Sequence, residues 1–191
     1  MINYTPPTKH TSLFYNSQEE YLDIVVPYLK AGLENNELCT WVVPETLKIE
    51  DAQEYLNKVS ENLNSYLEKE QLLIKGHQDF YLKDGVFSAY RTIDAVVELE
   101  KKALKKGFKG MRGTGDCSWA LDACWFSFLM YEKELNKVIE EYKIRALCSY
   151  SIPALDLKKI RDIGTSHQSS LVRQTDNWNR LDSQEFEKVN I

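Results

Sequence analysis

The segment from Arg112 to Trp119 combines glycines with side chains that could hold a ligand. It reads RGTGDCSW, so two glycines alternate with polar residues directly after an apolar run that predicts a strand. Glycines at such a point let the backbone turn sharply or approach a bound molecule closely. Arg112, Asp116 and Trp119 would then supply a cation, a carboxylate and an aromatic wall. An equally good interpretation is a strand-to-helix turn with an internal ion pair between Arg112 and Asp116.

The first predicted strand-to-helix junction lacks the features of a phosphate-binding loop. Nucleotide hydrolysis commonly uses the pattern Gly-x-x-x-x-Gly-Lys-Ser/Thr between a strand and a helix, whereas residues 13–20 read LFYNSQEE. Glu19 and Glu20 would repel a phosphate at the helix start. The short glycine-containing run at residues 113–115 does not replace the loop. We therefore expect no P-loop and no ATPase activity.

The cysteines and histidines show no spacing typical of a metal site or of thiol catalysis. There are four cysteines and three histidines: Cys39, Cys117, Cys124, Cys148, His10, His77 and His167. They form no Cys-x-x-Cys pair and no pair of histidines four residues apart on a helix. Cys148 lies in an apolar run, where burial raises the pKa of a thiol and weakens it as a nucleophile. We expect buried, reduced thiols, no metal and no cofactor, since Cys148 and His167 would meet only through folding.

Tyr131 and Glu132 lie near the start of the predicted fourth helix. Tyr131 continues a helical stripe with Leu135 and Val138, which favours a place in the core. A carboxylate near a helix N-terminus is stabilised by the helix dipole, so Glu132 also has an ordinary explanation. Each of the two residues therefore has a structural interpretation beside the functional one.

Hydrophobic periodicity predicts an α/β fold in which helices alternate with short buried strands. Helical stripes cover residues 18–35, 55–67, 93–104, 125–142 and, more briefly, 155–163. Apolar runs that predict strands cover residues 38–43, 71–75, 108–112, 145–152 and 168–172, after a first short run that ends near Tyr15. This alternation implies right-handed crossovers and a three-layer fold, with a mainly parallel sheet between helices. Pro27, in the middle of the first stripe, predicts a kink or a break.

Length and composition indicate one globular domain, residues 1–172, followed by a polar C-terminal tail, residues 173–191. The chain has 191 residues, of which 43% are hydrophobic and 28% charged, as in ordinary globular proteins. A net charge of −5 without a basic stripe argues against binding to nucleic acid. There is no apolar run near 18 residues and no signal-peptide pattern, so we expect a cytoplasmic protein that binds no membrane.

The chain is rich in aromatic residues, with 11 Tyr, 7 Phe and 4 Trp. Those on helical stripes are explained by the core. Tyr15, Trp41, Trp119 and Tyr150 instead fall in or just beyond predicted strands, near polar residues. Ligands of open parallel sheets bind beyond the carboxyl ends of the strands. These four residues therefore predict an aromatic wall of a binding site.

Several groups of residues follow one another in a recognisable order along residues 10–172. They are His10-x-x-x-Phe14-Tyr15, Gly32-Leu33-Glu34-x-Asn36-Glu37-x-Cys39-x-Trp41-Val42-Val43-Pro44, Gly107-Phe108-x-Gly110-x-Arg112-x-Thr114-Gly115-Asp116-x-Ser118-Trp119, Tyr131-Glu132 with Asn136, Leu147-Cys148-x-Tyr150 and His167. Together they resemble the MEDS domain, the sensory domain of methanogens, methylotrophs and DcmR-type regulators.

The resemblance implies a RecA-like or KaiC-like fold that has lost its nucleotide-binding loop, in agreement with the junction described above. It also implies sensing of a small hydrocarbon derivative, such as a halogenated or methylated one-carbon compound. Domains of this kind are often fused to a histidine kinase or a DNA-binding region, and we expect neither within these residues. Output would then pass through a signalling partner or a homo-oligomer.

The favoured hypothesis is a non-catalytic sensory domain that binds a small organic molecule at the carboxyl edge of the sheet. Such sites are mostly apolar with a few orienting polar groups. The residues expected to line it combine aromatic rings with polar groups: His10, Tyr15, Trp41, Arg112, Asp116, Trp119, Tyr131, Glu132, Cys148, Tyr150 and His167.

Two alternatives come from other functional classes. The first is an enzyme or methyl-group handling protein that uses Cys148, His167 or Glu132, which metal content and thiol reactivity would reveal. The second is a degenerate RecA-like interaction subunit, in which exposed Trp178 and Phe186 of the tail dock on a neighbour. Deleting the tail would then change the mass in solution.

Overall fold

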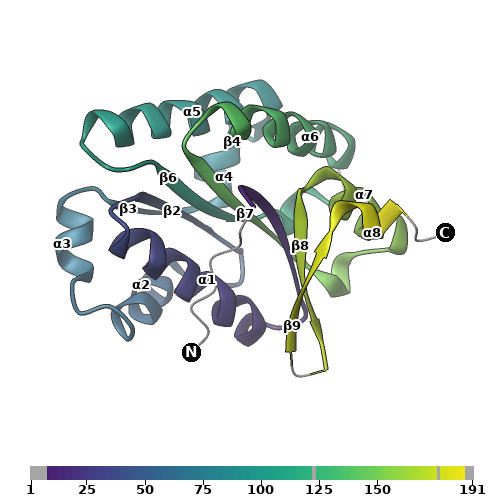
Figure 1. Ribbon diagram of the computed structural model, residues 1–191, viewed down its shortest axis with the longest axis horizontal. Coiled ribbons are helices and arrows are strands. Elements are labelled where there is room, and N and C mark those ends of the chain that lie inside the picture. Colours follow the sequence, from purple (N-terminus) through teal and green to yellow (C-terminus); the bar gives the residue numbers. More distant parts are fainter. Residues whose placement is uncertain (1–7, 122–123, 176, 188–191) are drawn as a thin grey trace.

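The computed structural model describes residues 8–121, 124–175 and 177–187, which form a three-layer α/β fold (Figure 1). A seven-stranded sheet is the middle layer, with the order β3-β2-β6-β7-β1-β8-β9. Neighbouring strands are parallel except for β8 and β9, which are antiparallel. The predicted α/β class with a mainly parallel sheet is therefore confirmed.

The strands of this sheet are short. Their bounds are β1 His10–Tyr15, β2 Leu38–Val43, β3 Leu72–Gly76, β6 Met111–Asp116, β7 Ile144–Ser151, β8 Ser169–Gln174 and β9 Asn177–Asp182. All residues of β1 and β2 are buried, because helices cover both faces of the sheet. That double cover explains why β2 is apolar along nearly its whole length instead of alternating.

Helices form the two outer layers, with α1, α2 and α3 on one face of the sheet and α5 and α6 on the other (Figure 1). Their bounds are α1 Gln18–Glu34, α2 Ile49–Asn57, α3 Leu63–Glu68, α4 His77–Tyr81, α5 Ala89–Lys105, α6 Trp125–Glu141, α7 Leu157–Ser166 and α8 Ser183–Glu187. Successive strand residues point to opposite faces, so the sheet has two cores. Leu13 and Trp41 belong to the core on the α1 face, and Phe14 and Tyr150 to the core on the α6 face.

The start of α1 follows its sequence signals closely. Ser17 caps the helix by accepting a hydrogen bond from the backbone N–H of Glu20 (3.2 Å), and only Asn16 and Ser17 separate β1 from α1. The helix continues through Pro27 without the predicted break. A proline removes the hydrogen bond to the carbonyl four residues earlier. Here that carbonyl belongs to the exposed Asp23, where water can replace the lost donor.

The glycine-containing segment lies within a strand, so the prediction that this strand ends before the glycines is wrong. β6 continues to Asp116. A Cβ on Gly113 would meet the Thr40 hydroxyl at 2.9 Å, and a Cβ on Gly115 would collide with the Tyr81 hydroxyl. Close packing on the α6 face therefore requires glycine at both positions and outweighs the low strand propensity of that residue.

Two predicted segments are subdivided in the structure. The helical stripe at residues 55–67 is two helices, α2 and α3, joined by a segment whose Ser60 and Asn62 favour turns and caps. The predicted loop at residues 77–85 contains α4 and β4 Leu82–Lys83, and β4 forms a hairpin with the following β5 Val86–Phe87. Its predicted turn is confirmed, because Asp84 and Gly85 both have positive φ (53° and 76°).

The described part of the predicted tail is attached to the sheet. β9 pairs with β8 as the edge strand, and α8 contacts α7. Phe186 is 5% exposed and stacks on Phe14 with ring centroids 6.1 Å apart. Trp178 is partly buried against the core of the α1 face. The expectation of an exposed Phe186 is therefore wrong, since the hairpin of β8 and β9 brings this ring back onto the core.

Across the described ranges, the helices are all too short or too polar to cross a lipid bilayer.

Candidate functional site

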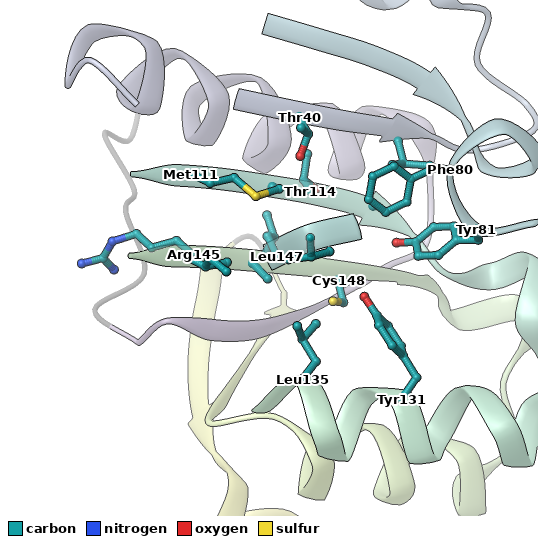
Figure 2. A pocket seen from close by; sticks show the side chains of 16 residues that line it. Thr40, Phe80, Tyr81, Met111, Thr114, Tyr131, Leu135, Arg145, Leu147 and Cys148 are labelled. Atoms are coloured by element: carbon teal, nitrogen blue, oxygen red, sulfur yellow. The ribbon is translucent and has the colours of Figure 1, made fainter. Parts of the chain in front are cut away.

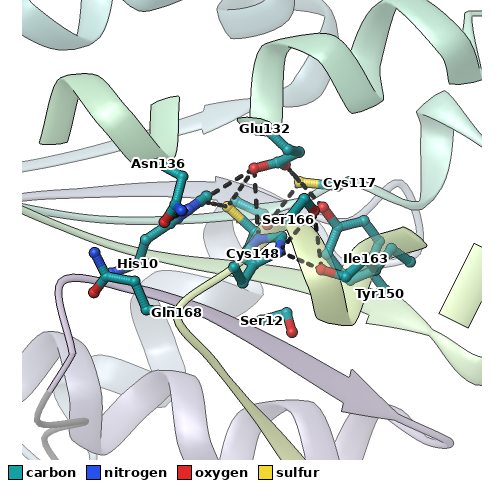
Figure 3. Close-up of polar contacts among 12 residues, drawn as sticks. His10, Ser12, Cys117, Glu132, Asn136, Cys148, Tyr150, Ile163, Ser166 and Gln168 are labelled. Atoms are coloured by element: carbon teal, nitrogen blue, oxygen red, sulfur yellow. Dashed lines mark hydrogen bonds and ion pairs between the residues drawn. The ribbon is translucent and has the colours of Figure 1, made fainter. Parts of the chain in front are cut away.

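Four buried side chains from distant parts of the chain meet on the α6 face of the sheet (Figure 3). His10 begins β1, Glu132 lies in α6, Cys148 lies in β7 and His167 directly follows α7. One ligating atom from each lies within 4.8 Å of the others, and each residue is at most 5% exposed. We refer to these four residues as the His-Glu-Cys cluster.

The topology of the sheet brings the cluster together. β1 and β7 are parallel neighbours, so His10 and Cys148 project from the same face. Glu132 reaches that face from α6, which packs over it. His167 is fixed beside β1, because the backbone N–H of the next residue, Gln168, donates to the carbonyl of His10 (3.0 Å). The cluster therefore depends on the strand order β7-β1-β8.

Glu132 lies at the centre of the cluster. Its Oε2 is 3.1 Å from His10 Nε2, 3.5 Å from His167 Nε2 and 3.6 Å from Cys148 Sγ. The Cys148 sulfur is also 3.6 Å from His10 Nε2. The second carboxylate oxygen, Oε1, accepts a hydrogen bond from the Tyr150 hydroxyl (2.8 Å). Oε2 of Glu132 thus faces the other members of the cluster, while Oε1 is hydrogen-bonded to Tyr150, which is not a member.

Both histidine rings are held by hydrogen bonds on their outward nitrogens. His167 Nδ1 donates to the backbone carbonyl of Ile163 at 2.8 Å. His10 Nδ1 lies 3.2 Å from the side-chain oxygen of Asn136. Asn136 is absent from the predicted site residues. Its spacing of four residues from Glu132, which places both on one face of a helix, was the signal that could have identified it.

The buried surroundings set the protonation states of the cluster. Burial, followed by the electrostatic effect of the neighbouring His10 ring, lowers the pKa of His167 to about 3, so the His167 imidazole is neutral. Burial opposes the charge of Glu132, but the two histidines and the Tyr150 hydroxyl lower its pKa below the usual value. The contact with Cys117, followed by burial, raises the pKa of Cys148 well above its usual value. A protonated thiol of this kind is a poor nucleophile.

A small apolar cavity borders the cluster at Cys148 (Figure 2). Its volume is about 30 Å³, which is room for roughly two water-sized groups. Leu135 and Tyr131 of α6 line it from one side, and β6 and β7 line it from the other. Gly113 and Gly115 contribute only backbone to this wall, which helps to leave the space open.

A second polar group surrounds Asp116 at the carboxyl edge of the sheet. The Tyr15 hydroxyl donates to its carboxylate at 2.7 Å, the backbone N–H of Ser118 at 3.1 Å and the Ser149 hydroxyl at 3.3 Å. Burial raises the pKa of Asp116, although these hydrogen bonds offset part of the effect. Burial also raises the pKa of Tyr15, beyond its already high ordinary value.

Arg112 lies at the other end of β6 and has a different partner from the one predicted. Its Nε is 2.5 Å from Glu37 Oε2, and its Nη1 donates to the carbonyl of Tyr28 at 3.1 Å. The predicted ion pair with Asp116 is wrong. Four strand residues place the two side chains about 13 Å apart along β6, although both point to the α1 face. Arg112 therefore lies beneath α1, where it links β6 to Glu37 and to the backbone of α1.

The two predicted tryptophans also lie outside the cluster. Trp41 is fully buried, and its indole N–H donates to the Tyr21 hydroxyl at 2.6 Å. Trp119 packs against Tyr81 and Phe87, with ring centroids 5.2 Å and 5.5 Å away. Trp41 thus belongs to the core of the α1 face, and Trp119 to an aromatic group beside α4.

The predicted residues therefore separate into two sets. At the cluster or its cavity lie His10, Tyr131, Glu132, Cys148, Tyr150 and His167. Elsewhere lie Tyr15, Trp41, Arg112, Asp116 and Trp119. The first set lies over the middle of the sheet and not at the carboxyl ends of its strands. His10 is the first residue of β1, and Cys148 lies in the middle of β7. A larger open groove of about 650 Å³, between α1 and α2, contains none of the eleven predicted ligand-binding residues, although Trp178 lines it.

Comparison with known proteins identifies a sensory family. The family model MEDS, described as the methanogen/methylotroph DcmR sensory domain, matches residues 9–168. All four members of the His-Glu-Cys cluster fall within this range. The transcriptional repressor DcmR of Methylorubrum extorquens is 26% identical over 173 residues, which cover 84% of this chain. The match covers 58% of the repressor, so this chain spans less than two thirds of that relative.

Solved structures of three archaeal proteins, one of them described as KaiC-like, share this fold. The flagellar accessory protein FlaH of Methanocaldococcus jannaschii aligns with a TM-score of 0.59 and 12% identity, over 92% of this chain and 77% of that one. A KaiC-like protein of Pyrococcus horikoshii gives 0.59 and 14%, over 91% and 77%. An uncharacterised P. horikoshii protein, solved with an unknown peptide, gives 0.63 and 12%, over 91% and 82%. These likenesses establish a RecA/KaiC-like fold.

Proposed function

This chain belongs to the MEDS family of sensory domains, and we propose that it is a non-catalytic sensor of a small organic molecule. Family membership and the likeness to a transcriptional repressor support a sensory or regulatory role. The ligand class, a one-carbon or hydrocarbon-derived molecule, is part of the proposal. So is an output that passes through a partner protein or a second copy of the chain.

The observation that carries the proposal is the apolar cavity beside the His-Glu-Cys cluster. A volume of about 30 Å³ suits a molecule with one carbon atom far better than a nucleotide or a peptide. Cys148 brings a thiol to the cavity, and Thr40, Tyr81 and Tyr131 bring hydroxyls to a wall that is mostly apolar. Such a wall would favour a neutral, mostly apolar ligand with one polar or polarisable group.

Two features support binding without catalysis. Only Asn16 and Ser17 connect β1 to α1, and this junction contains neither the glycines nor the lysine that hold a nucleotide phosphate. The raised pKa of Cys148 keeps its thiol protonated, which disfavours covalent chemistry on the ligand.

Signalling requires that the ligand favour one of two conformations. Tyr131 and Leu135 of α6 and Phe80 and Tyr81 of α4 line the cavity, so a ligand there would contact two helices at once. We propose that a shift of these helices carries the signal to the outer surface. The DcmR relative is a transcriptional repressor, and a comparable output here would use a separate partner or another copy of the chain.

A ligand screen with a cavity-filling variant tests the proposal. Halogenated and methylated one-carbon compounds are added to the purified chain, and thermal unfolding is followed. A true ligand at 100 times its Kd should raise Tm by about 5–10 °C. Ala146→Val adds two methyl groups to the cavity wall and should abolish the increase. Ala52→Val, which adds the same groups to the core of the α1 face, should preserve it.

Two results would contradict the proposed function. One is the absence of stabilisation by every compound while circular dichroism shows an intact fold. The other is an equal loss of the ligand effect in both alanine variants. A cysteine thiol with a strongly lowered pKa in the metal-free protein would instead support methyl-group handling.

A further inference from the structure

We propose that His10, Glu132, Cys148 and His167 bind a single transition-metal ion, for which Zn²⁺ is the expected occupant. Sequence spacing alone favoured buried thiols without a metal, because these residues are far apart along the chain. In the folded chain, however, the ligating atoms of these four residues lie within 4.8 Å of one another. The inference goes beyond the proposed function, since it concerns the cluster itself and not the neighbouring cavity.

Four of the six distances between the ligating atoms are close to those between the ligands of a tetrahedral zinc ion, and all six are within 4.8 Å. With zinc bonds of 2.0–2.1 Å to nitrogen or oxygen and about 2.3 Å to sulfur, neighbouring ligands lie about 3.3–3.6 Å apart. The measured separations around Glu132 Oε2 are 3.1 Å to His10, 3.5 Å to His167 and 3.6 Å to Cys148. The pair His10 and Cys148 adds 3.6 Å. Only small side-chain movements are needed to place an ion between them.

The His167 ring is prepared to act as a ligand. Its Nδ1 hydrogen is given to the Ile163 carbonyl, so Nε2 carries a lone pair. This Nε2 is buried and has no hydrogen-bond partner among the described residues. Leaving a buried polar atom without a hydrogen bond normally destabilises the folded protein. A metal ion would use the lone pair and remove that cost.

The outer hydrogen bonds of the cluster also follow the pattern of metal sites. Metal-binding histidines commonly donate their second nitrogen to a carbonyl or carboxylate, and ligating carboxylates are held by further donors. Here the Ile163 carbonyl holds His167, the Asn136 amide oxygen holds His10, and the Tyr150 hydroxyl holds Glu132. All three arrangements leave the inward atom free to face the centre.

The charges of the cluster balance those of a divalent ion. Glu132 contributes one negative charge, and Cys148 contributes a second when its thiol ionises. Binding therefore replaces the thiol proton with a metal–sulfur bond, and the proton passes to the solvent. Two neutral imidazoles complete four ligands. The resulting site is electrically neutral, which suits its complete burial.

The donor set favours zinc over the other common ions. Imidazole nitrogen and thiolate sulfur suit Zn²⁺ and exclude the hard ions Mg²⁺ and Ca²⁺, which prefer oxygen. Four protein ligands fill a tetrahedral shell, as in sites that hold an ion without using it as a catalyst. The expected role is therefore to fix the relative positions of β1, β7, α6 and the turn after α7.

Cobalt substitution tests the inference directly. The full chain is stripped with a chelator and titrated with Co²⁺ alone, which gives intense visible bands in a tetrahedral site and a near-ultraviolet band when bound to thiolate. The expected result is saturation at one equivalent, displacement by Zn²⁺ and zinc in the untreated protein by elemental analysis. Cys148→Ser should remove the near-ultraviolet band. Cys39→Ser, which changes a buried thiol on the opposite face, should retain it.

A second variant tests whether the hydrogen bonds around the cluster serve metal binding or only the packing of the core. Asn136→Leu removes the hydrogen bond to His10 without removing a ligand, and it should weaken cobalt binding by about 10–100-fold. The inference is overturned if the folded wild-type chain binds no stoichiometric cobalt or zinc. It is equally overturned if Cys148→Ser and Cys39→Ser have the same cobalt spectrum.

Discussion

Arg112 and Glu37 form a buried ion pair below α1. Only 3% of the Arg112 side chain and 11% of the Glu37 side chain are exposed. Gly32 makes room for the pair, because a Cβ there would meet Cδ of Arg112 at 2.7 Å. The net stability of such a pair is small, but removing one partner leaves a buried charge without compensation. Arg112 is therefore needed for stability mainly because it neutralises the buried charge of Glu37.

This asymmetry predicts the behaviour of two variants. Arg112→Met should lower the free energy of unfolding by about 3–5 kcal/mol, as measured by urea denaturation. The double variant with Glu37→Gln should recover most of the loss, because no buried charge then remains. A loss below about 1 kcal/mol in the single variant, or no recovery in the double variant, would contradict this interpretation.

Asp116 predicts a pH-dependent contribution to stability. Burial raises its pKa in the folded chain, so the folded state binds the proton more tightly than the unfolded state does. Stability must then fall as pH rises from the unfolded pKa of about 4 through the folded pKa. Asp116→Asn should therefore become more stable relative to wild type as pH increases through this window. Urea denaturation at several pH values measures the difference, with the exposed Asp23→Asn as the control.

The prediction would be contradicted if the free energy of unfolding of Asp116→Asn, relative to that of wild type, stayed constant or decreased as pH rises.

Side-chain partners were the least predictable feature at the residue scale. Arg112 and Asp116 were predicted to bind a ligand or to form an ion pair with each other, but their partners are Glu37 and Tyr15. Glu37 directly precedes β2, which pairs with β6, whereas Tyr15 ends β1, which β7 separates from β6. Local sequence spacing does not contain that information, whereas the capping of α1 by Ser17, a contact within one turn, was predictable.

Among the elements, the hairpin of β8 and β9 with α8 fixes the C-terminal part of the described chain. Phe186 of α8 lies against Gly164 of α7, where a Cβ would collide with its ring, and stacks on Phe14 of β1. A segment that reads as polar in sequence therefore places one aromatic anchor in the core. A single anchor of this kind is hard to recognise, because it produces no periodic pattern.

The position of this anchor predicts a large stability effect. Phe186→Ala should lower the free energy of unfolding by about 3–5 kcal/mol, because it leaves a cavity between α7, α8 and β1. Phe126→Ala is the matched control, since that ring is 77% exposed and should change stability by less than about 0.5 kcal/mol. Equal effects of the two substitutions in thermal or urea unfolding would show that α8 does not hold Phe186 in the core.

Most helices and strands were predictable because their apolar periodicity is strong. The exceptions have local causes: glycines at 113 and 115 concealed the end of β6, and turn-forming residues divided the stripe of α2 and α3. In β6 the packing of Thr40 and Tyr81 decides the conformation. Such packing depends on neighbouring elements that are distant in sequence.

At the scale of the whole molecule, the alternation of helices and strands predicted the layered α/β class, but not the strand order. The His-Glu-Cys cluster exists because β1 lies between β7 and β8. Without that order, the convergence of His10 with Cys148 and His167 could not be derived from spacing. The six residues gathered at the cluster or its cavity were predicted as candidates, but their common location on the α6 face was not.

The positions of His10 and His167 near opposite ends of the described chain have a consequence for folding. Their rings lie 4.1 Å apart, so any occupant that joins them acts as a clasp around nearly the entire domain. For a permanent cross-link that closes a loop of more than 100 residues, the loss of chain entropy in the unfolded state stabilises the folded state by about 4–5 kcal/mol. Such a clasp can close only on a chain in which β1 and β8 have already paired, because that pairing places His167 beside His10.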